Sequence, residues 1–154
     1  MAHQSYSLTL DGASKLTDAT AFTSTAAGSV SGGDGYVNFG SATAFAKFAV
    51  VIDWTTCVVN DGNELYTVVI EGATESGFST AYRLVDYAFG DTSVTGHPVD
   101  TSPSGRKVIY GDNVVITSAS DGNSVATMQY LRIKVFVAGT TPSMNLAAWL
   151  VPMP

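Results

Sequence analysis

The sequence contains few of the residues from which many functional sites are built. Its 154 residues include one cysteine, Cys57, and two histidines, His3 and His97. A lone cysteine cannot form an intrachain disulfide, and without a histidine pair it does not supply the usual zinc ligands. We therefore expect no metal site and no disulfide framework, and a chain that is made in a reducing cytoplasm.

Charged residues are also scarce. They make up 13% of the chain, and seven Lys and Arg against thirteen Asp and Glu give a formal net charge of −6. No basic run is present, so neither a nucleic acid nor an anionic membrane surface is an expected partner. No apolar run is long enough to span a bilayer, and the segment Met1–Tyr6 lacks the features of a signal peptide. The composition favours one soluble globular domain.

Catalytic signatures are nearly absent. The segment Gly28–Gly32 superficially resembles a nucleophile elbow, but its central residue is Val30 rather than serine. His97 lies near Asp91 and Asp100 in sequence, and such groups can form an acid/base or metal cluster, although isolated loop His and Asp side chains are usually solvated. We therefore predict a non-enzymatic protein with no catalytic, cofactor-binding or metal-binding residues.

Apolar residues recur with a period of two in segments bounded by Gly, Asp, Asn or Pro, whereas no window shows a helical stripe. Eight to ten strands joined by turns and long connections predict an all-β fold. The expected architecture is a two-sheet β-sandwich, jelly-roll-like, with an extended N-terminal arm. The expected strands cover residues 5–10, 36–39, 45–52, 64–71, 82–89, 107–110, 113–117, 125–138 and 144–151.

The N-terminal segment differs from the rest. Residues 13–35 are mostly small, with short apolar islands around Leu16 and Phe22 and a glycine-rich break before Tyr36. We interpret them as an extended arm or loop with room for one strand, because so few large apolar residues have little means of forming a core alone. Within a single domain, residues 1–35 would form a strand and arm and residues 36–154 the sandwich. Candidate contact residues in the arm are Leu16, Phe22 and Val30.

Two further features suggest contacts. The connection over residues 90–105 is about twice the usual length, which makes its His97 a candidate contact. Arg132 and Lys134 share one face of the expected strand 125–138, and with Arg106 and Lys107 they form the main concentration of cations. Such cations usually pair with Asp or Glu across strands, but they could also form an interface with an acidic partner.

Two segments resemble a known virion family. They are Leu65–Phe78, a strand leading into a small acidic turn, and Tyr130–Pro142, a long strand with a Gly-Thr turn. Both resemble capsid cement, or decoration, proteins of tailed bacteriophages with a small jelly-roll fold. The resemblance extends from about Phe45 to the C-terminus and does not align the 90–105 connection.

The resemblance implies a non-enzymatic virion protein without a cofactor, made in the host cytoplasm. It would bind the outside of an icosahedral shell and cement neighbouring capsomers of major capsid protein. It would also associate with itself as a homodimer or homotrimer, which agrees with the apolar residues on both faces of the expected strands 82–89 and 125–138.

Other classes remain open. A carbohydrate-binding module or tail-associated adhesin with a jelly-roll fold would use aromatic side chains such as Trp54 and Trp149, although aromatic residues in sandwiches are more often buried. A hydrolase would need a convergent pair of carboxylates. The candidates on or near expected strands are Asp53, Glu64, Glu71 and Asp86.

Overall fold

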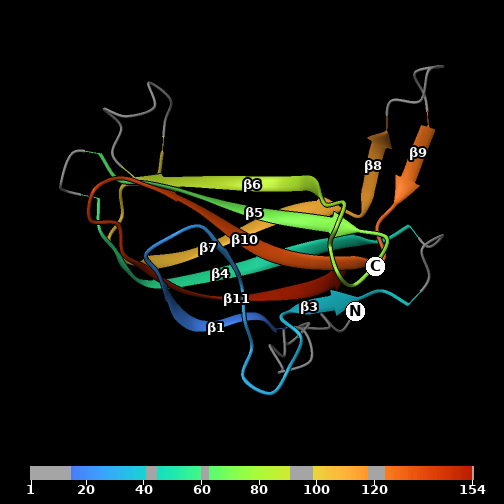
Figure 1. The fold of residues 1–154 in the computed structure, drawn as a ribbon, viewed down its shortest axis with the longest axis horizontal. Coiled ribbons are helices and arrows are strands. Elements are labelled where there is room, and N and C mark those ends of the chain that lie inside the picture. Colours follow the sequence, from blue (N-terminus) through green and yellow to red (C-terminus); the bar gives the residue numbers. More distant parts are fainter. Residues whose placement is uncertain (1–14, 41–44, 60–62, 91–98, 118–123, 154) are drawn as a thin grey trace, which may run out of the picture.

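The computed structural model describes residues 15–40, 45–59, 63–90, 99–117 and 124–153 (Figure 1). This part of the chain is all-β and contains no helix, hence none that could cross a membrane. The expected strand 5–10 and the candidate contact His97 lie outside the described residues. The strands are β1 (Lys15–Phe22), β2 (Ala26–Ala27), β3 (Tyr36–Asn38), β4 (Lys47–Cys57), β5 (Leu65–Ala73), β6 (Tyr82–Gly90), β7 (Gly105–Asp112), β8 (Val114–Thr117), β9 (Ser124–Thr127), β10 (Tyr130–Ala138) and β11 (Met144–Met153).

The strands form two antiparallel sheets and a separate β8–β9 hairpin. One sheet has the order β1-β11-β4-β7, and the other has the order β2-β10-β5-β6 with β3 also paired to β10. Strands β2 and β3 follow each other along one edge of β10, so they act as one interrupted strand. If β2 and β3 count as one strand and the β8–β9 hairpin is left out, the eight sheet strands numbered in chain order are arranged 1-8-3-6 in one sheet and 2-7-4-5 in the other. This is the double Greek key of a jelly roll, so the expected fold class is confirmed.

The core fills the space between the two sheets. Because side chains alternate along a strand, every second residue of each central strand points inward. From β4 these are Phe48, Val50 and Ile52, which are fully buried. From β10 they are Leu131, Ile133 and Val135, which are fully buried as well. Alternation along the sequence therefore located the inner face of β10, whereas residues 45–52 form a nearly continuous apolar run that does not distinguish the two faces of β4.

The segment expected to be an N-terminal arm is in part a strand of the sandwich. Strand β1 pairs with β11, and both Leu16 and Phe22 lie in the core, 0% and 3% exposed. The chain then crosses to the other sheet and forms β2. At Gly28, directly after β2, an added Cβ would lie 2.6 Å from Leu16 O and would collide with Ile133 Cγ2. Only glycine fits this close approach of the backbone to β1 and β10. The expectation that Leu16 and Phe22 are free to contact a partner was wrong.

The single strand expected over residues 125–138 is in fact two strands, β9 and β10. They are separated at Met128, whose side chain is fully buried in the core. The Met128 N–H group donates to Asn113 O at 2.6 Å, and the Gln129 N–H group donates to Ala73 O at 2.9 Å. The chain changes partners between these two residues, from the hairpin to the main sheet, and this change ends the strand.

Candidate interaction surfaces

The described residues include no group of three or more His, Cys, Asp or Glu side chains that could hold a metal ion. Cys57 is buried, and its burial, with the negative charge of Asp100 adding to it, raises the pKa of the thiol to about 12. A thiol with so high a pKa is not a nucleophile at neutral pH.

Each carboxylate considered for hydrolysis has a hydrogen-bond or ion-pair partner within the chain. Asp53 accepts hydrogen bonds from Arg106 Nε and Nη2 at 2.5 and 2.6 Å on the outer face of one sheet. Glu71 lies on the outer face of the other sheet, and Asp86 forms an ion pair with Arg83 at 2.8 Å. Glu64 is fully buried, and its carboxylate accepts from the Asn63 N–H group at 3.4 Å.

Arg132 and Lys134 lie together on the outer face of the β10–β5–β6 sheet. They flank Glu71, which is 7% exposed, with Arg132 Nη2 at 2.8 Å and Lys134 Nζ at 3.7 Å from its carboxylate. Register places Arg132 directly opposite Glu71 on the neighbouring strand. Both cations therefore have an acidic partner within their own chain, and the Arg132 guanidinium in particular is held in place.

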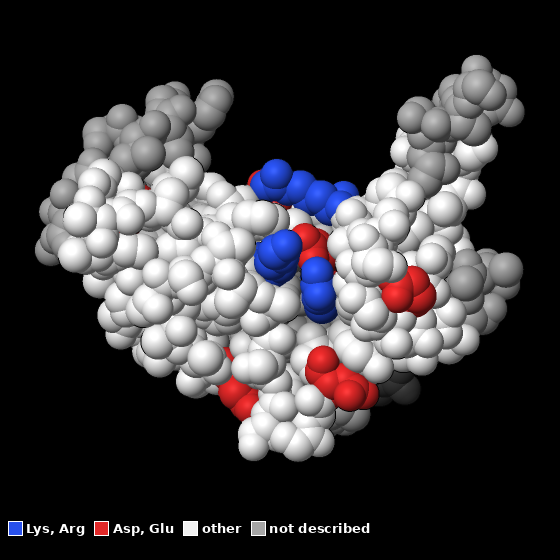
Figure 2. Space-filling view, in the orientation of Figure 1, with Lys and Arg blue, Asp and Glu red and all other residues white. Residues whose placement is uncertain are grey.

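Aromatic side chains surround this ion-pair cluster. The Arg132 guanidinium lies 4.3 Å from the Phe78 ring centroid, and Lys134 Nζ lies 4.8 Å from that of Phe136, which is 41% exposed. With the Arg83–Asp86 pair, three cations and two carboxylates form ion pairs on this face. Figure 2 shows Lys and Arg atoms gathered over the middle of this face.

The outer face of strands β11, β4 and β7 is mostly apolar, and Lys15 of β1 borders it, with its Nζ atom 5.6 Å from the Trp149 ring centroid. Tyr110 is 65% exposed, Val108 37% and Met153 41%, and the half-buried Trp149 and Val151 complete the surface. Register places these side chains around Ala49 and Val51 of β4, which are nearly buried between them. We call this surface the apolar sheet face. The sequence contained its signal, because residues 48–52 are apolar at outward as well as inward positions.

Charged residues close both ends of the apolar sheet face. The Arg106–Asp53 ion pair lies at one end, and its hydrogen bonds hold the pKa of Asp53 below its usual value. Lys47 and Asp112 lie opposite each other at the other end and are exposed. The face is thus an apolar band between two charged ends, which is the usual anatomy of a protein interface.

The β8–β9 hairpin carries a second exposed apolar surface. Figure 1 shows it standing away from the sandwich. Ile116 and Val125 are cross-strand partners and are 73% and 64% exposed, whereas Val115 and Ala126 pack toward the core. Fully buried Asn113 anchors its base by accepting from the Ala46 N–H group at 2.8 Å and donating to Met128 O at 3.0 Å.

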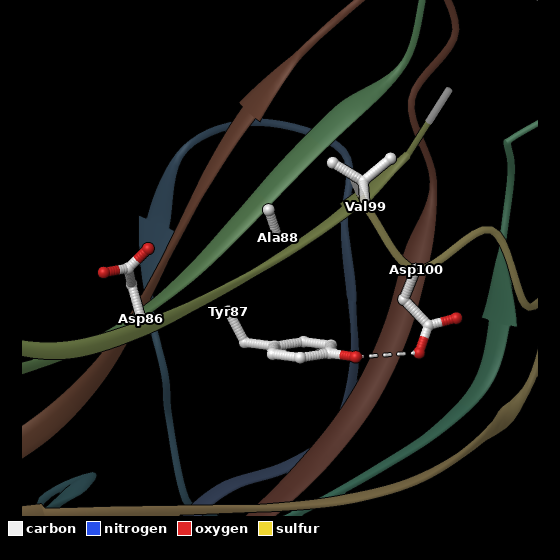
Figure 3. Close-up of a pocket in the computed structure, with 5 residues that line it drawn as sticks. All are labelled: Asp86, Tyr87, Ala88, Val99 and Asp100. Atoms are coloured by element: carbon white, nitrogen blue, oxygen red, sulfur yellow. Dashed lines mark hydrogen bonds between the residues drawn. The ribbon is translucent and has the colours of Figure 1, made fainter. Parts of the chain in front are cut away.

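A shallow depression of about 400 Å³ lies beside the edge of β6, and its lining includes the Tyr87 and Asp100 side chains (Figure 3). The Tyr87 hydroxyl group donates to Asp100 Oδ2 at 3.1 Å. Burial alone would raise the pKa of Asp100, but hydrogen bonds from Ser102 and Tyr87, together with Lys107, lower it. Asp100 thus stays ionised and acts as a hydrogen-bond acceptor.

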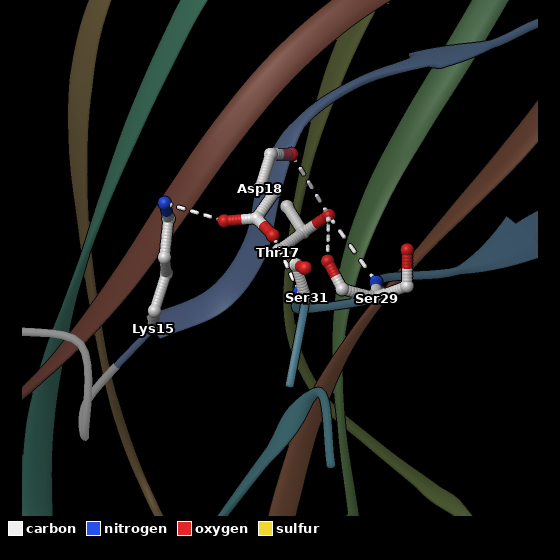
Figure 4. A network of polar contacts seen from close by, with 5 residues as sticks. All are labelled: Lys15, Thr17, Asp18, Ser29 and Ser31. Carbon is white, nitrogen blue, oxygen red and sulfur yellow. Dashed lines mark hydrogen bonds and ion pairs between the residues drawn. The ribbon is translucent and has the colours of Figure 1, made fainter. Parts of the chain in front are cut away.

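Val30, the last candidate contact of the expected arm, lies in a turn that is attached to β1. Its carbonyl group accepts from Gly33 N–H at 3.1 Å, and the neighbouring Ser31 N–H donates to Asp18 Oδ2 at 2.6 Å. The Asp18 carboxylate also binds Lys15 Nζ at 2.5 Å (Figure 4). Val30 is half-buried, so it keeps some exposed surface. Among the candidate contacts that lie in the described part of the chain, only Arg132 and Lys134 lie together on one surface.

Comparisons with models of known protein families, with curated proteins and with solved structures find no match. The function of this protein is therefore inferred from the fold, from the two exposed apolar surfaces and from the two sequence segments that resemble capsid cement proteins.

Proposed function

We propose that this protein is a non-enzymatic cement protein that binds the outer surface of an icosahedral phage capsid and joins neighbouring capsomers. One observation carries the proposal: exposed apolar side chains gather on two separate surfaces, the apolar sheet face and the β8–β9 hairpin. Large exposed apolar patches mark interaction sites, and a protein that joins neighbours needs more than one. The major capsid protein and further copies of this chain are the proposed partners, and the virion exterior is the proposed location.

The fold is compatible with this role, but a jelly roll also serves lectins and enzymes, so it does not select the function. The resemblance to cement proteins adds to the case. The two segments that carry it, 65–78 and 130–142, contain β5 and β10, which pair with each other along their full length from Ala73–Tyr130 to Leu65–Ala138. The resemblance therefore covers the middle of one sheet, not two unrelated pieces.

We assign capsid contact to the β8–β9 hairpin. Ile116 and Val125 project side by side, and each would contribute about 1.5–3 kcal/mol if a groove between capsomers buried it completely. An oligomer that engages several lattice positions at once gains further through effective concentration. Because such binding favours the assembled shell, it must also raise the stability of the shell.

The test uses shells from which cement protein has been stripped, together with free major capsid subunits. We expect co-sedimentation with shells at much lower concentration than binding to free subunits, and a higher shell melting temperature. The double variant Ile116→Ser/Val125→Ser should bind shells at least about tenfold more weakly, because it removes both apolar contacts. Phe136→Ser, which removes an exposed apolar side chain on another surface, is the matched control. Equal affinity for shells and subunits, or an unchanged melting temperature, would refute the cement function.

Carbohydrate binding is the second candidate, and the depression beside Tyr87 is the observation that favours it. Asp100 supplies a carboxylate acceptor there, and Tyr87 supplies an aromatic ring. Carboxylates and aromatic rings are common in sites that bind small polar ligands. A glycan array separates the candidates: specific glycan binding that Asp100→Asn abolishes would support the binding module over the cement protein.

A further inference from the structure

The outward side chains of the apolar sheet face are arranged in a regular pattern. Cross-strand register between β7, β4 and β11 places them in four rows of three. The first row holds a charged pair and an alanine, the second and third are apolar, and the fourth holds a charged pair and a methionine. In order, the rows are Arg106, Asp53, Ala147; Val108, Val51, Trp149; Tyr110, Ala49, Val151; and Asp112, Lys47, Met153.

We propose that a second copy of this chain docks on the apolar sheet face, related to the first by a two-fold axis that crosses the strands at right angles. The axis lies in the interface and passes between the second and third rows. It therefore places the first row of each copy against the fourth row of the other. Arg106 then faces Asp112 of the second copy, and Asp53 faces its Lys47, so four pairs of opposite charge surround the apolar centre.

The same axis matches the apolar rows by size. Tyr110 faces the smaller Val108 of the second copy, and Val51 faces Ala49. On β11, Trp149 faces Val151. Large side chains meet smaller ones, which lets two sheets interdigitate at the usual spacing of about 10 Å.

The charges also distinguish this axis from the alternative. A two-fold axis parallel to the strands through β4 would place Asp53 against Asp53 and Lys47 against Lys47. Arg106 and Asp112 would then face Ala147 and Met153 of β11, which carry no charge. Like charges that directly face each other across an interface are unfavourable, so the charge pattern selects the axis that crosses the strands.

The size of the face sets the expected strength of the dimer. Three strands spaced about 4.8 Å apart and seven residues of about 3.3 Å each give roughly 14 Å by 23 Å. Two such faces bury on the order of 650 Å², which is smaller than a typical stable interface and predicts a weak, micromolar dimer. The inference stands whether or not the protein binds a capsid, because it depends only on the self-complementary rows.

The test inverts the charges at one end of the face at a time. Variant X is Lys47→Glu/Asp112→Lys, and variant Y is Asp53→Lys/Arg106→Glu. Each keeps the net charge and leaves opposite charges facing each other across β4 and β7. In a dimer of X, however, Arg106 faces the lysine introduced at position 112, and Asp53 faces the glutamate introduced at position 47. A dimer of Y contains the corresponding repulsions, whereas in a mixed X–Y dimer every facing pair is again of opposite charge.

Sedimentation velocity across micromolar concentrations should show a wild-type dimer, at least about tenfold weaker self-association of X and of Y, and a heterodimer when X and Y are mixed. Inverting the Arg83–Asp86 pair on the opposite face, as Arg83→Glu/Asp86→Lys, should leave the dimer unchanged. Circular dichroism and thermal melting of each variant confirm that it is folded. A monomeric or trimeric wild type, undiminished dimers of X or Y, or a mixture that associates no better than its components would overturn the proposal.

Discussion

Glu71 and Arg132 face each other on β5 and β10, and Arg132 Nε donates to Glu71 Oε2 at 2.9 Å on the outside of the sandwich. The acid is 7% exposed and also lies 3.7 Å from Lys134. Loss of its charge would leave two neighbouring cations without their shared carboxylate.

We therefore expect Glu71→Gln to lower the free energy of unfolding by about 1–3 kcal/mol in urea titrations. The more exposed pair Arg83–Asp86 is the control, because its side chains are 55% and 46% exposed. Asp86→Asn should change stability by less than about 1 kcal/mol. Equal effects of the two substitutions would contradict a special role for Glu71.

Leu16 is a core residue of β1, although the sequence favoured a contact arm. We expect Leu16→Ala to destabilise the protein by about 2–5 kcal/mol, because it leaves a cavity at a fully buried position. Ala19→Ser on the same strand, where the residue is exposed, should change stability by no more than about 0.5 kcal/mol. Denaturant midpoints measure both. If deletion of residues 16–30 left a stable sandwich, this assignment of β1 would be wrong.

Asn113 should control the base of the β8–β9 hairpin. Asn113→Ala leaves the Ala46 N–H group and Met128 O without their side-chain partner, at a cost of about 1–3 kcal/mol. Hydrogen exchange should show faster exchange in β8 and β9 than in β4 or β10. Ile116→Thr, an exposed substitution in the same hairpin, should leave exchange at the base unchanged. Uniformly faster exchange throughout the sandwich would speak against a local role.

Acid should weaken the link between β1 and the Ser31 turn. Interaction with Lys15, and then the Ser31 N–H group, lower the pKa of Asp18 from its ordinary 3.8. A lowered pKa means that the interaction stabilises the folded state above pH 3.8 and is lost as the pH falls through the folded value. The Ser31 amide resonance should therefore titrate with a midpoint below 3.8, and the change should vanish in Asp18→Asn. A midpoint at or above 3.8 would show that the carboxylate is not held by these groups.

Cys57 should resist modification in the folded protein. Its thiol is buried and its pKa is raised to about 12, so little thiolate forms near neutral pH. We expect slow labelling by a thiol reagent in native buffer and rapid labelling after unfolding in urea. Fast native labelling would place the thiol at the surface.

Much of the fold could be predicted from local sequence. Alternation of side chains has a period of two in a strand, and this period located the middle of β5, β6, β10 and β11. It failed at Met128, because a change of hydrogen-bond partners, not a change of pattern, separates β9 from β10. It also missed β1 as a core strand, since its small and polar residues pack only because β11 supplies the neighbour.

The candidate surfaces were less predictable. Arg106 and Lys107 were grouped with Arg132 and Lys134 as one concentration of cations, but they lie on the other sheet. Arg106 pairs with Asp53 on its outer face, whereas Lys107 Nζ lies 4.8 Å from the Tyr87 ring centroid. Adjacent residues of a strand point to opposite sides, so nearness in sequence does not indicate a shared surface.

The all-β class, the positions of most strands and the apolar inner faces follow from the amino-acid sequence, because they depend on periodicity within a few residues. Only the folded chain shows which strands are neighbours. This pairing of strands also places Arg106 and Asp53 at one end of an apolar face and Lys47 and Asp112 at the other end. Those partners are about 50–70 residues apart in the chain. Their pairing follows from the jelly-roll register, a non-local choice that no short sequence pattern encodes.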